Sequence, residues 1–243
     1  KQLFDKSGAL LGGKKIGEVR DRYLYSRGEP TPGCRVRESG HSFEVNWAEG
    51  QKTGFFLDQR ENRRLLSTIA TGRRVLNAYS YSGGFSVYAL AGGAGKVLSV
   101  DSSASAIELL DRNIALNGFQ ERHESVKGEV QPLLTERAGE FDLIILDPPA
   151  FAKHKSARHQ AVQGYKRLNQ AAISRIPSGG LVMTFSCSQV VGQELFEGAV
   201  RAAAIESGRK VRVLARPSQP ADHPVNIFQP EGEYLKGLLL QIS

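Results

Sequence analysis

Three short segments of this chain carry side chains that can bind a ligand or take part in a reaction. Each follows an apolar, strand-like run: the Gly-bearing turn at 79–84, the turn Asp147-Pro148-Pro149, and Cys187. The carboxyl ends of parallel strands lie at the edge where open α/β sheets bind their ligands. The three segments therefore predict one active site on one edge of a sheet.

The turn at 79–84 has the features of a nucleotide-like cofactor site. Its glycines let the backbone approach a ligand closely, and the N-terminus of the helix expected next faces the same site. Asp101, at the end of the second strand, is suited to hold ribose hydroxyls. The turn departs from G-x-G-x-x-G, which argues against NAD and favours S-adenosylmethionine, a cofactor without phosphates. A plain strand-to-helix turn is the alternative. The predicted cofactor residues are Tyr79, Ser80, Gly83, Gly84, Asp101, Ser102, Glu129 and Asp147.

Glu129 follows a short run at 124–126 that is expected to form the third strand. Its carboxylate can accept a hydrogen bond from an adenine amino group. An exposed glutamate is also commonly only solvated, and the sequence leaves both interpretations open.

Asp147 and Cys187 are the two residues that we predict to be catalytic. Two prolines hold Asp147 on a stiff turn, which is useful for fixing a flat base against a methyl donor. A thiolate at Cys187 can attack C6 of a cytosine and turn C5 into a carbon nucleophile, which is covalent catalysis. The alternatives are an ordinary strand-ending turn for Asp147 and a small buried hydrophobe for Cys187. The serines that flank Cys187 are not typical of a core position.

The pattern of elements predicts an α/β fold with a doubly wound, Rossmann-like, seven-stranded sheet and a small β-rich segment before it. We assign residues 1–52 to part of a β-rich domain and 53–243 to the sheet domain. The connection at 215–234 is too irregular for a crossover helix, so we expect the last strand to run antiparallel. The expected strands are 75–78, 96–100, 143–146, 180–185, 211–214 and 235–242, and the expected helices are 61–70, 85–91, 104–116 and 190–205.

The composition is that of an ordinary globular protein, 40% hydrophobic and 23% charged. We expect no membrane span, no signal peptide and no metal, and the two cysteines favour a reducing, cytoplasmic setting. The chain opens on Lys rather than Met, which is compatible with a fragment. A net charge of +7 favours a polyanionic partner such as RNA. The sequence does not fix the oligomeric state and is compatible with a homodimer.

A basic, partly aromatic segment follows the Asp147 turn. Such a segment can hold phosphates and stack a base, although a solvated charged loop would have the same composition. The predicted RNA-binding residues are Lys153, Lys155, Arg158, Tyr165 and Lys166, with His154, His159 and Arg167 beside them.

From about residue 40 onward the chain resembles a known family. The segments that carry the resemblance are 50–60 (GQKTGFFLDQR), 79–85 (YSYSGGF), 147–151 (DPPAF), 164–166 (GYK), 184–188 (TFSCS), 221–224 (ADHP) and 230–237 (PEGEYLKG). They are similar to the bacterial class I S-adenosylmethionine-dependent methyltransferases that make 5-methylcytosine in large-subunit ribosomal RNA. The resemblance implies a Cys187 nucleophile, an Asp101 contact to ribose, Asp147 at the base, and Gln59 and Arg60 near the methionine end of the cofactor.

The chain departs from that family in three ways. No N-terminal PUA RNA-binding domain is visible, Ala150 stands where Lys is often found, and Glu129 stands where Asp is more usual. Many RNA cytosine-C5 enzymes also have a second Cys at the place of Ala150, so the base that removes the C5 proton is not identified.

Other functions remain compatible with these residues. A guanine-N7 or amine methyltransferase on the same scaffold would need no cysteine. A non-catalytic RNA-binding or assembly factor could retain the cofactor fold, and a dehydrogenase fits the glycine turn poorly.

Overall fold

The computed structural model describes residues 1–7, 21–51, 53–152 and 154–243, and it divides into two compact units, Lys1–Leu57 and Asp58–Ser243. Whether residues 1–52 are part of a larger β-rich domain stays a prediction.

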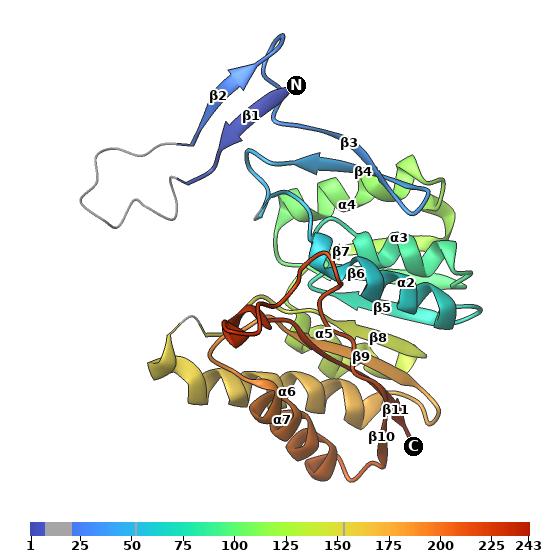
Figure 1. Cartoon of the computed structure of the whole chain (residues 1–243). Coiled ribbons are helices and arrows are strands. Elements are labelled where there is room, and N and C mark those ends of the chain that lie inside the picture. Colours follow the sequence, from blue (N-terminus) through green and yellow to red (C-terminus); the bar gives the residue numbers. More distant parts are fainter. Residues whose placement is uncertain (8–20, 52, 153) are drawn as a thin grey trace. The chain divides into compact units, whose positions relative to one another are not determined.

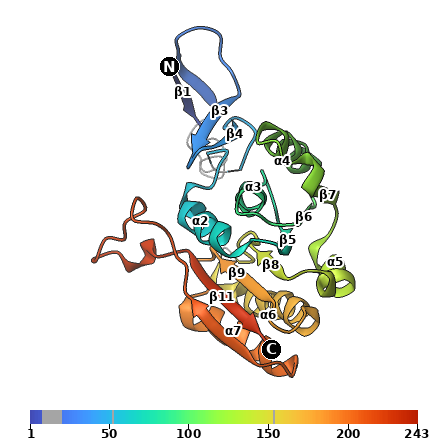
Figure 2. The same ribbon diagram turned by 90° about the vertical axis from the view of Figure 1, so that its right-hand side faces the viewer.

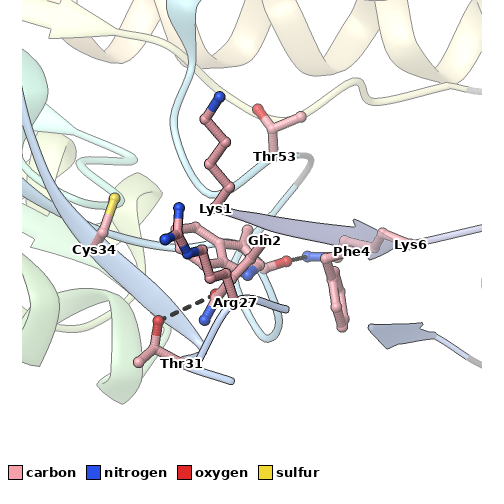
Figure 3. Close-up of a pocket in the computed structure, with 9 residues that line it drawn as sticks. Lys1, Gln2, Phe4, Lys6, Arg27, Thr31, Cys34 and Thr53 are labelled. Carbon is pink, nitrogen blue, oxygen red and sulfur yellow. Dashed lines mark hydrogen bonds between the residues drawn. The ribbon is translucent and has the colours of Figure 1, made fainter. Parts of the chain in front are cut away.

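The N-terminal unit contains two antiparallel hairpins (Figure 1). β1 (Gln2–Asp5) pairs with β2 (Arg22–Ser26), and β3 (Gly33–Glu38) pairs with β4 (His41–Asn46). Phe43 of β4 packs on Phe55 with 4.9 Å between the ring centroids. A hollow of about 490 Å³ lies beside the hairpins, with cationic and aromatic side chains in its lining (Figure 3).

The C-terminal unit is built on a seven-stranded sheet in the order β10-β11-β9-β8-β5-β6-β7. The neighbours from β9 to β7 pair in parallel, and β11 is antiparallel to both β9 and β10. The expected doubly wound sheet with an antiparallel last strand is thus confirmed. The strands are β5 (Arg74–Ala78), β6 (Lys96–Asp101), β7 (His123–Lys127), β8 (Leu143–Leu146), β9 (Leu181–Ser186), β10 (Val211–Ala215) and β11 (Lys236–Ile242).

Helices cover both faces of this sheet. Figures 1 and 2 show α2, α3 and α4 on one face and α5, α6 and α7 on the other. The helices are α2 (Arg60–Ile69), α3 (Gly84–Ala91), α4 (Ala104–Leu116), α5 (Val130–Arg137), α6 (Arg158–Arg175) and α7 (Gln193–Glu206). Because all four residues of β8 are buried, its apolar run needs a helix layer on each face, which these helices provide.

The order of the strands decides where a ligand can bind. β5 lies between β6 and β8: the chain runs from β5 outward to β6 and β7, and then returns to β8 on the other side of β5. Such a switch point opens a crevice at the carboxyl ends of the strands. The turns after β5, β6, β8 and β9 all lie at this edge, because those four strands are parallel.

No helix in the described part of the chain is both long and apolar enough to cross a membrane. The same residues contain no group of three or more His, Cys, Asp or Glu arranged to hold a metal ion.

Candidate active site

The turn after β5 has an unusual backbone. Tyr79 and Tyr81 have φ values of 59° and 43°, and Gly83 has a φ of 79°. Positive φ is uncommon for residues other than glycine and needs support from the surroundings. Part of that support comes from backbone hydrogen bonds: Ser80 N–H donates to the carbonyl of Val100 (3.1 Å), and Gly83 N–H donates to the carbonyl of Ser80 (2.9 Å).

Asp101 ends β6 and fixes this turn from the neighbouring strand. One carboxylate oxygen, Oδ2, accepts the Tyr81 N–H, and Oδ1 accepts the Ser103 N–H, both over 2.9 Å. A carboxylate oxygen can accept more than one hydrogen bond, so Asp101 keeps capacity for a hydroxyl. Ser102, next in the chain, is exposed.

Tyr79, Asp101 and Glu129 gather at this edge. Burial raises the pKa of the Tyr79 hydroxyl to about 12, and the negative charges of Glu129 and Asp101 act in the same direction. Glu129 is exposed at the residue before α5. Three of the predicted cofactor residues, which come from three different strand ends, therefore lie together.

Asp147 follows β8 and is held by the start of α2. Gln59 donates from Nε2 to Oδ2 of Asp147 over 3.0 Å. Asn62 in turn donates from Nδ2 to Oε1 of Gln59 (2.6 Å) and to the carbonyl of Ser218 (3.2 Å). Gln59 and Asn62 are both buried, so this chain of hydrogen bonds sets the orientation of the Asp147 carboxylate.

Cys187 follows β9 and is partly accessible, while Ser186 and Ser188 on either side of it are buried. Ser188 Oγ donates to the Ala152 carbonyl (2.9 Å), and Lys236 Nζ donates to the Ser188 carbonyl (2.7 Å). The segment around Cys187 is thus tied both to the loop after Asp147 and to β11.

Tyr165 of α6 links the two proposed catalytic residues. Burial raises the pKa of its hydroxyl to about 12; Ser186 opposes this shift, and negative charges at Cys187 and Asp147 add to it. The hydroxyl is buried and makes no well-formed hydrogen bond within the described residues, although Ser186 and the Phe151 backbone are close enough to influence it. Asp147 and Cys187 therefore both lie near one buried phenol.

Sequence comparison identifies the class of protein. Residues 20–228 match the profile of the S-adenosylmethionine-dependent methyltransferase family. The chain belongs to this family. The cofactor expected from the turn at 79–84 is thereby confirmed.

Named relatives of this methyltransferase are ribosomal RNA enzymes. It is 41% identical over 220 residues to ribosomal RNA large subunit methyltransferase I of Alteromonas mediterranea, and 41% identical over 244 residues to that of Aeromonas salmonicida. These matches cover 89% and 98% of this chain and 55% and 61% of the relatives, so the chain spans little more than half of their length.

Solved structures support the same assignment. A methyltransferase of Streptococcus mutans aligns with a TM-score of 0.79 at 26% identity, over 91% of this chain and 58% of its own. The structure named SMU.776, a methyltransferase complexed with SAH, aligns with the same TM-score at 28% identity and the same coverage.

The residues present fit S-adenosylmethionine. A Cβ on Gly83 would lie 2.8 Å from Leu110 Cγ, and one on Gly84 would lie 3.1 Å from Arg63 Cδ, so the turn is closely packed on its protein side. The Asp101 carboxylate at the end of β6 and the backbone of the turn are the groups that would hold the ribose and methionine parts, and the cofactor supplies an electrophilic methyl group.

Arg60 lies at the beginning of α2 and forms two ion pairs. Its Nη1 lies 2.7 Å from Oδ2 of Asp222, and its Nε lies 3.1 Å from Oε1 of Glu61. The pair with Asp222 joins the 216–235 connection to α2, whereas Glu61 belongs to α2 itself. An approach of Arg60 to the methionine end of the cofactor stays a prediction.

The segment predicted to bind RNA needs one correction. Residues 158–175 form a helix, α6, that was not among the expected helices. Tyr165 is wholly buried between Phe151 and Phe196, so it offers no face for base stacking. Lys166 is half-buried and paired with Glu206. Lys153 lies outside the described residues. The exposed members of the segment are His154, Lys155, Arg158, His159 and Arg167.

Three residues of the site were not predicted. Asn62 supports Gln59, Lys236 contacts the Cys187 segment, and Arg63 is buried against Gly84 with its guanidinium 5.8 Å from the Tyr88 ring centroid. Asn62 and Arg63 lie three and four residues after Gln59, so a helix places them on the same face as Gln59. This spacing is the signal in the sequence that could have identified them.

Proposed function

We propose that this methyltransferase makes 5-methylcytosine in large-subunit ribosomal RNA through a covalent bond between Cys187 and C6 of the base. The observation that carries the proposal is the convergence of Cys187 and Asp147, from the ends of β9 and β8, on the same sheet edge as the cofactor turn. The relatives are named as ribosomal RNA large subunit methyltransferases, which supports ribosomal RNA as the substrate.

The chemistry asked of Cys187 is nucleophilic attack. The target cytosine must leave its stack so that C5 and C6 are accessible. The Cys187 thiolate then forms an S–C6 bond, and the electrons of the C5–C6 double bond make C5 a nucleophile toward the donated methyl group. A base removes the C5 proton, the double bond re-forms, and the thiolate leaves.

Asp147 is proposed to stabilise the base during this attack. A protonated N3 and the amino group at C4 present donors to a carboxylate, and hydrogen bonds that strengthen as charge develops lower the barrier. Gln59 engages Oδ2 of Asp147, which restricts the carboxylate to one orientation before the base arrives.

Replacement of Cys187 with Ala tests this function. We expect the variant to lose methylation of ribosomal RNA and to bind S-adenosylmethionine with an affinity near that of the unmodified protein. RNA that contains 5-fluorocytosine lacks the C5 proton, so it should form a persistent adduct with the unmodified protein and none with Cys187→Ala. Full methylation by the variant would favour a guanine-N7 or amine methyltransferase, and cofactor binding without any methylation of RNA by either protein would favour a non-catalytic assembly factor.

A further inference from the structure

Lys236 is a buried cation that lies across the backbone of the Cys187 segment. It is the first residue of β11 and stands opposite Ser186 in the antiparallel pairing with β9. Its Nζ donates to the carbonyl of Ser188 over 2.7 Å. The side chain therefore extends from the residue before Cys187 to the residue after it.

Close packing fixes the position of this lysine. The next residue, Gly237, pairs with Phe185, and a Cβ at Gly237 would lie 2.6 Å from the Pro217 carbonyl oxygen and 2.7 Å from Phe185 Cε1. β11 therefore approaches β9 and the 216–235 connection too closely for another residue type at this place. This close packing favours the register that places Lys236 opposite Ser186, the residue before Cys187.

The burial of Lys236 calls for a negative partner. Only 5% of its surface is exposed, and an ammonium removed from water is costly unless it is paired. In the part of the chain that the structure describes, its side chain makes one hydrogen bond, to the neutral Ser188 carbonyl, and no ion pair with a carboxylate. Burial lowers the pKa of the Lys236 ammonium, and negative charge on Cys187 opposes this shift more strongly than Glu233 does.

We propose that Lys236 is the counter-ion of Cys187, and that its ammonium keeps this thiol in the thiolate form that attacks the base. Lys236 is a positioning residue, because it acts through Cys187 rather than on the substrate. The inference rests on the proposed function, in which Cys187 is the nucleophile. A thiolate beside a lysine is both more abundant at neutral pH and held in place.

The other titratable groups near Cys187 do not provide this charge. Tyr165 on α6 and Tyr234 before β11 are neutral phenols whose pKa values are raised, chiefly by burial, and Tyr234 also donates to Asp58 Oδ2 over 2.7 Å. Asp147 after β8 is an acid, and its negative charge would disfavour a thiolate. Among these neighbours, Lys236 is the cation.

The test measures the pKa of the Cys187 thiol directly. Cys34 is exposed and would also react, so every protein carries Cys34→Ser. The rate of iodoacetamide modification of Cys187 is followed by mass spectrometry between pH 5 and pH 10 for the Lys236→Met, Lys236→Arg and Lys210→Met variants. Lys210 is an exposed lysine just before β10 and serves as the matched control.

We expect Lys236→Met to raise the midpoint of this pH profile by about one unit or more, which lowers the modification rate near neutral pH about tenfold. Lys236→Arg keeps the positive charge and should keep the midpoint near that of the parent protein, and Lys210→Met should leave the midpoint unchanged. If Lys236 had only a structural role, its replacement would not change the midpoint of the Cys187 profile. An unchanged midpoint in a Lys236→Met protein that still binds S-adenosylmethionine overturns the inference.

A reciprocal measurement covers the case in which Lys236→Met does not fold. In Cys187→Ala the thiolate is absent, so the pKa of Lys236, followed by NMR of its labelled ε-carbon, should fall relative to the unmodified protein. An unaltered Lys236 titration contradicts the pairing. Methylation by Cys187→Ala would refute the proposed function, whatever the Lys236→Met variant shows. If Cys187→Ala is inactive but the Cys187 thiol midpoint is unshifted in Lys236→Met, only the pairing is refuted.

Discussion

Gln59 Nε2 lies 3.0 Å from Oδ2 of Asp147 and joins the residue before α2 to the turn after β8. The two residues are 88 positions apart in the chain. Gln59 is itself held by a hydrogen bond from Asn62, so the side chain that orients the Asp147 carboxylate is also fixed in position. The turn of two prolines alone does not provide this orientation.

Gln59→Leu is therefore expected to lower kcat/KM for RNA methylation. The change removes a hydrogen bond to a charged group, which is worth about 1.5–3 kcal/mol, so the loss should be about tenfold to a hundredfold. Gln160→Leu, at an exposed position on α6, is the matched control and should retain activity. Activity of Gln59→Leu within twofold of the unmodified protein would show that Asp147 needs no such support.

Asp101→Ala is expected to weaken S-adenosylmethionine binding about tenfold or more. The substitution removes a charged acceptor for ribose and also releases the Tyr81 N–H that Asp101 holds. Isothermal titration calorimetry measures the change, with Glu108→Ala on the exposed face of α4 as the control. Equal affinities of Asp101→Ala and the control for S-adenosylmethionine would show that Asp101 does not bind the cofactor.

Gly83→Ala should destabilise the fold more than Gly118→Ala. Both glycines have positive φ, 79° and 72°, but an added Cβ at Gly83 would meet Leu110 Cγ at 2.8 Å, while at Gly118 it would meet nothing within 4 Å. Strain alone costs about 1 kcal/mol, and crowding of a buried leucine adds about 1–3 kcal/mol. Urea unfolding of the two variants measures the difference, and equal losses would mean that Leu110 moves aside without cost.

Much of the sheet was predictable because its signals are local. The uninterrupted apolar run at 143–146 coincides with β8, and the helix expected at 104–116 coincides with α4. The helix α6 was missed because its basic residues suggested a solvated segment. Its buried residues Ala161, Tyr165, Leu168 and Ala172 repeat at three and four positions, which is a helical period.

The sequence predicts the part of the site that lies at the ends of the strands. The turn at 79–84, Asp101, Asp147 and Cys187 all lie at the predicted edge of the sheet. Their side-chain partners were not accessible from the sequence, because Gln59 and Lys236 reach the site from residues far along the chain. Local spacing carries no information on such contacts.

His123 should make stability depend on pH. Burial lowers its pKa from 6.5 to about 4, with Asp111 and Glu124 opposing this shift, and the ring shares a 2.8 Å hydrogen bond with Ser99 Oγ. Between about pH 4 and pH 6.5 the unfolded chain binds a proton that the folded protein does not, so the stability from this group is complete above pH 6.5 and is lost as the pH falls.

The pH effect of His123 is at most about 3–4 kcal/mol, since one pKa unit corresponds to about 1.4 kcal/mol. Urea unfolding at pH 5 and pH 7.5 measures it, and His123→Gln should reduce the difference between the two values. His159→Gln, at an exposed position, is the control. A difference that is the same in all three proteins would assign the pH effect to other groups.

Lys155 and Arg158 are expected to contact RNA phosphates, and their replacement by Ala should weaken RNA binding. Both are exposed, and they follow the Asp147 turn in the chain. If each neutralises one phosphate of single-stranded RNA, the negative slope of log affinity against log salt should become shallower by about 1.4 in the double variant. Filter binding or fluorescence anisotropy between about 50 and 200 mM salt measures this slope.

The control for the RNA prediction is the pair Lys210→Ala and Arg212→Ala. β11 is antiparallel to both β9 and β10, so β10 runs in the same direction as β9 and begins at the opposite edge of the sheet. Lys210 and Arg212 are exposed at that beginning, and they carry the same charge as the tested pair. If RNA binding depended only on net charge, the two double variants would lose the same affinity. If a phosphate-binding surface lies beside Asp147, only the Lys155 and Arg158 variant should lose affinity. Equal losses in the two double variants would place RNA binding elsewhere on the methyltransferase.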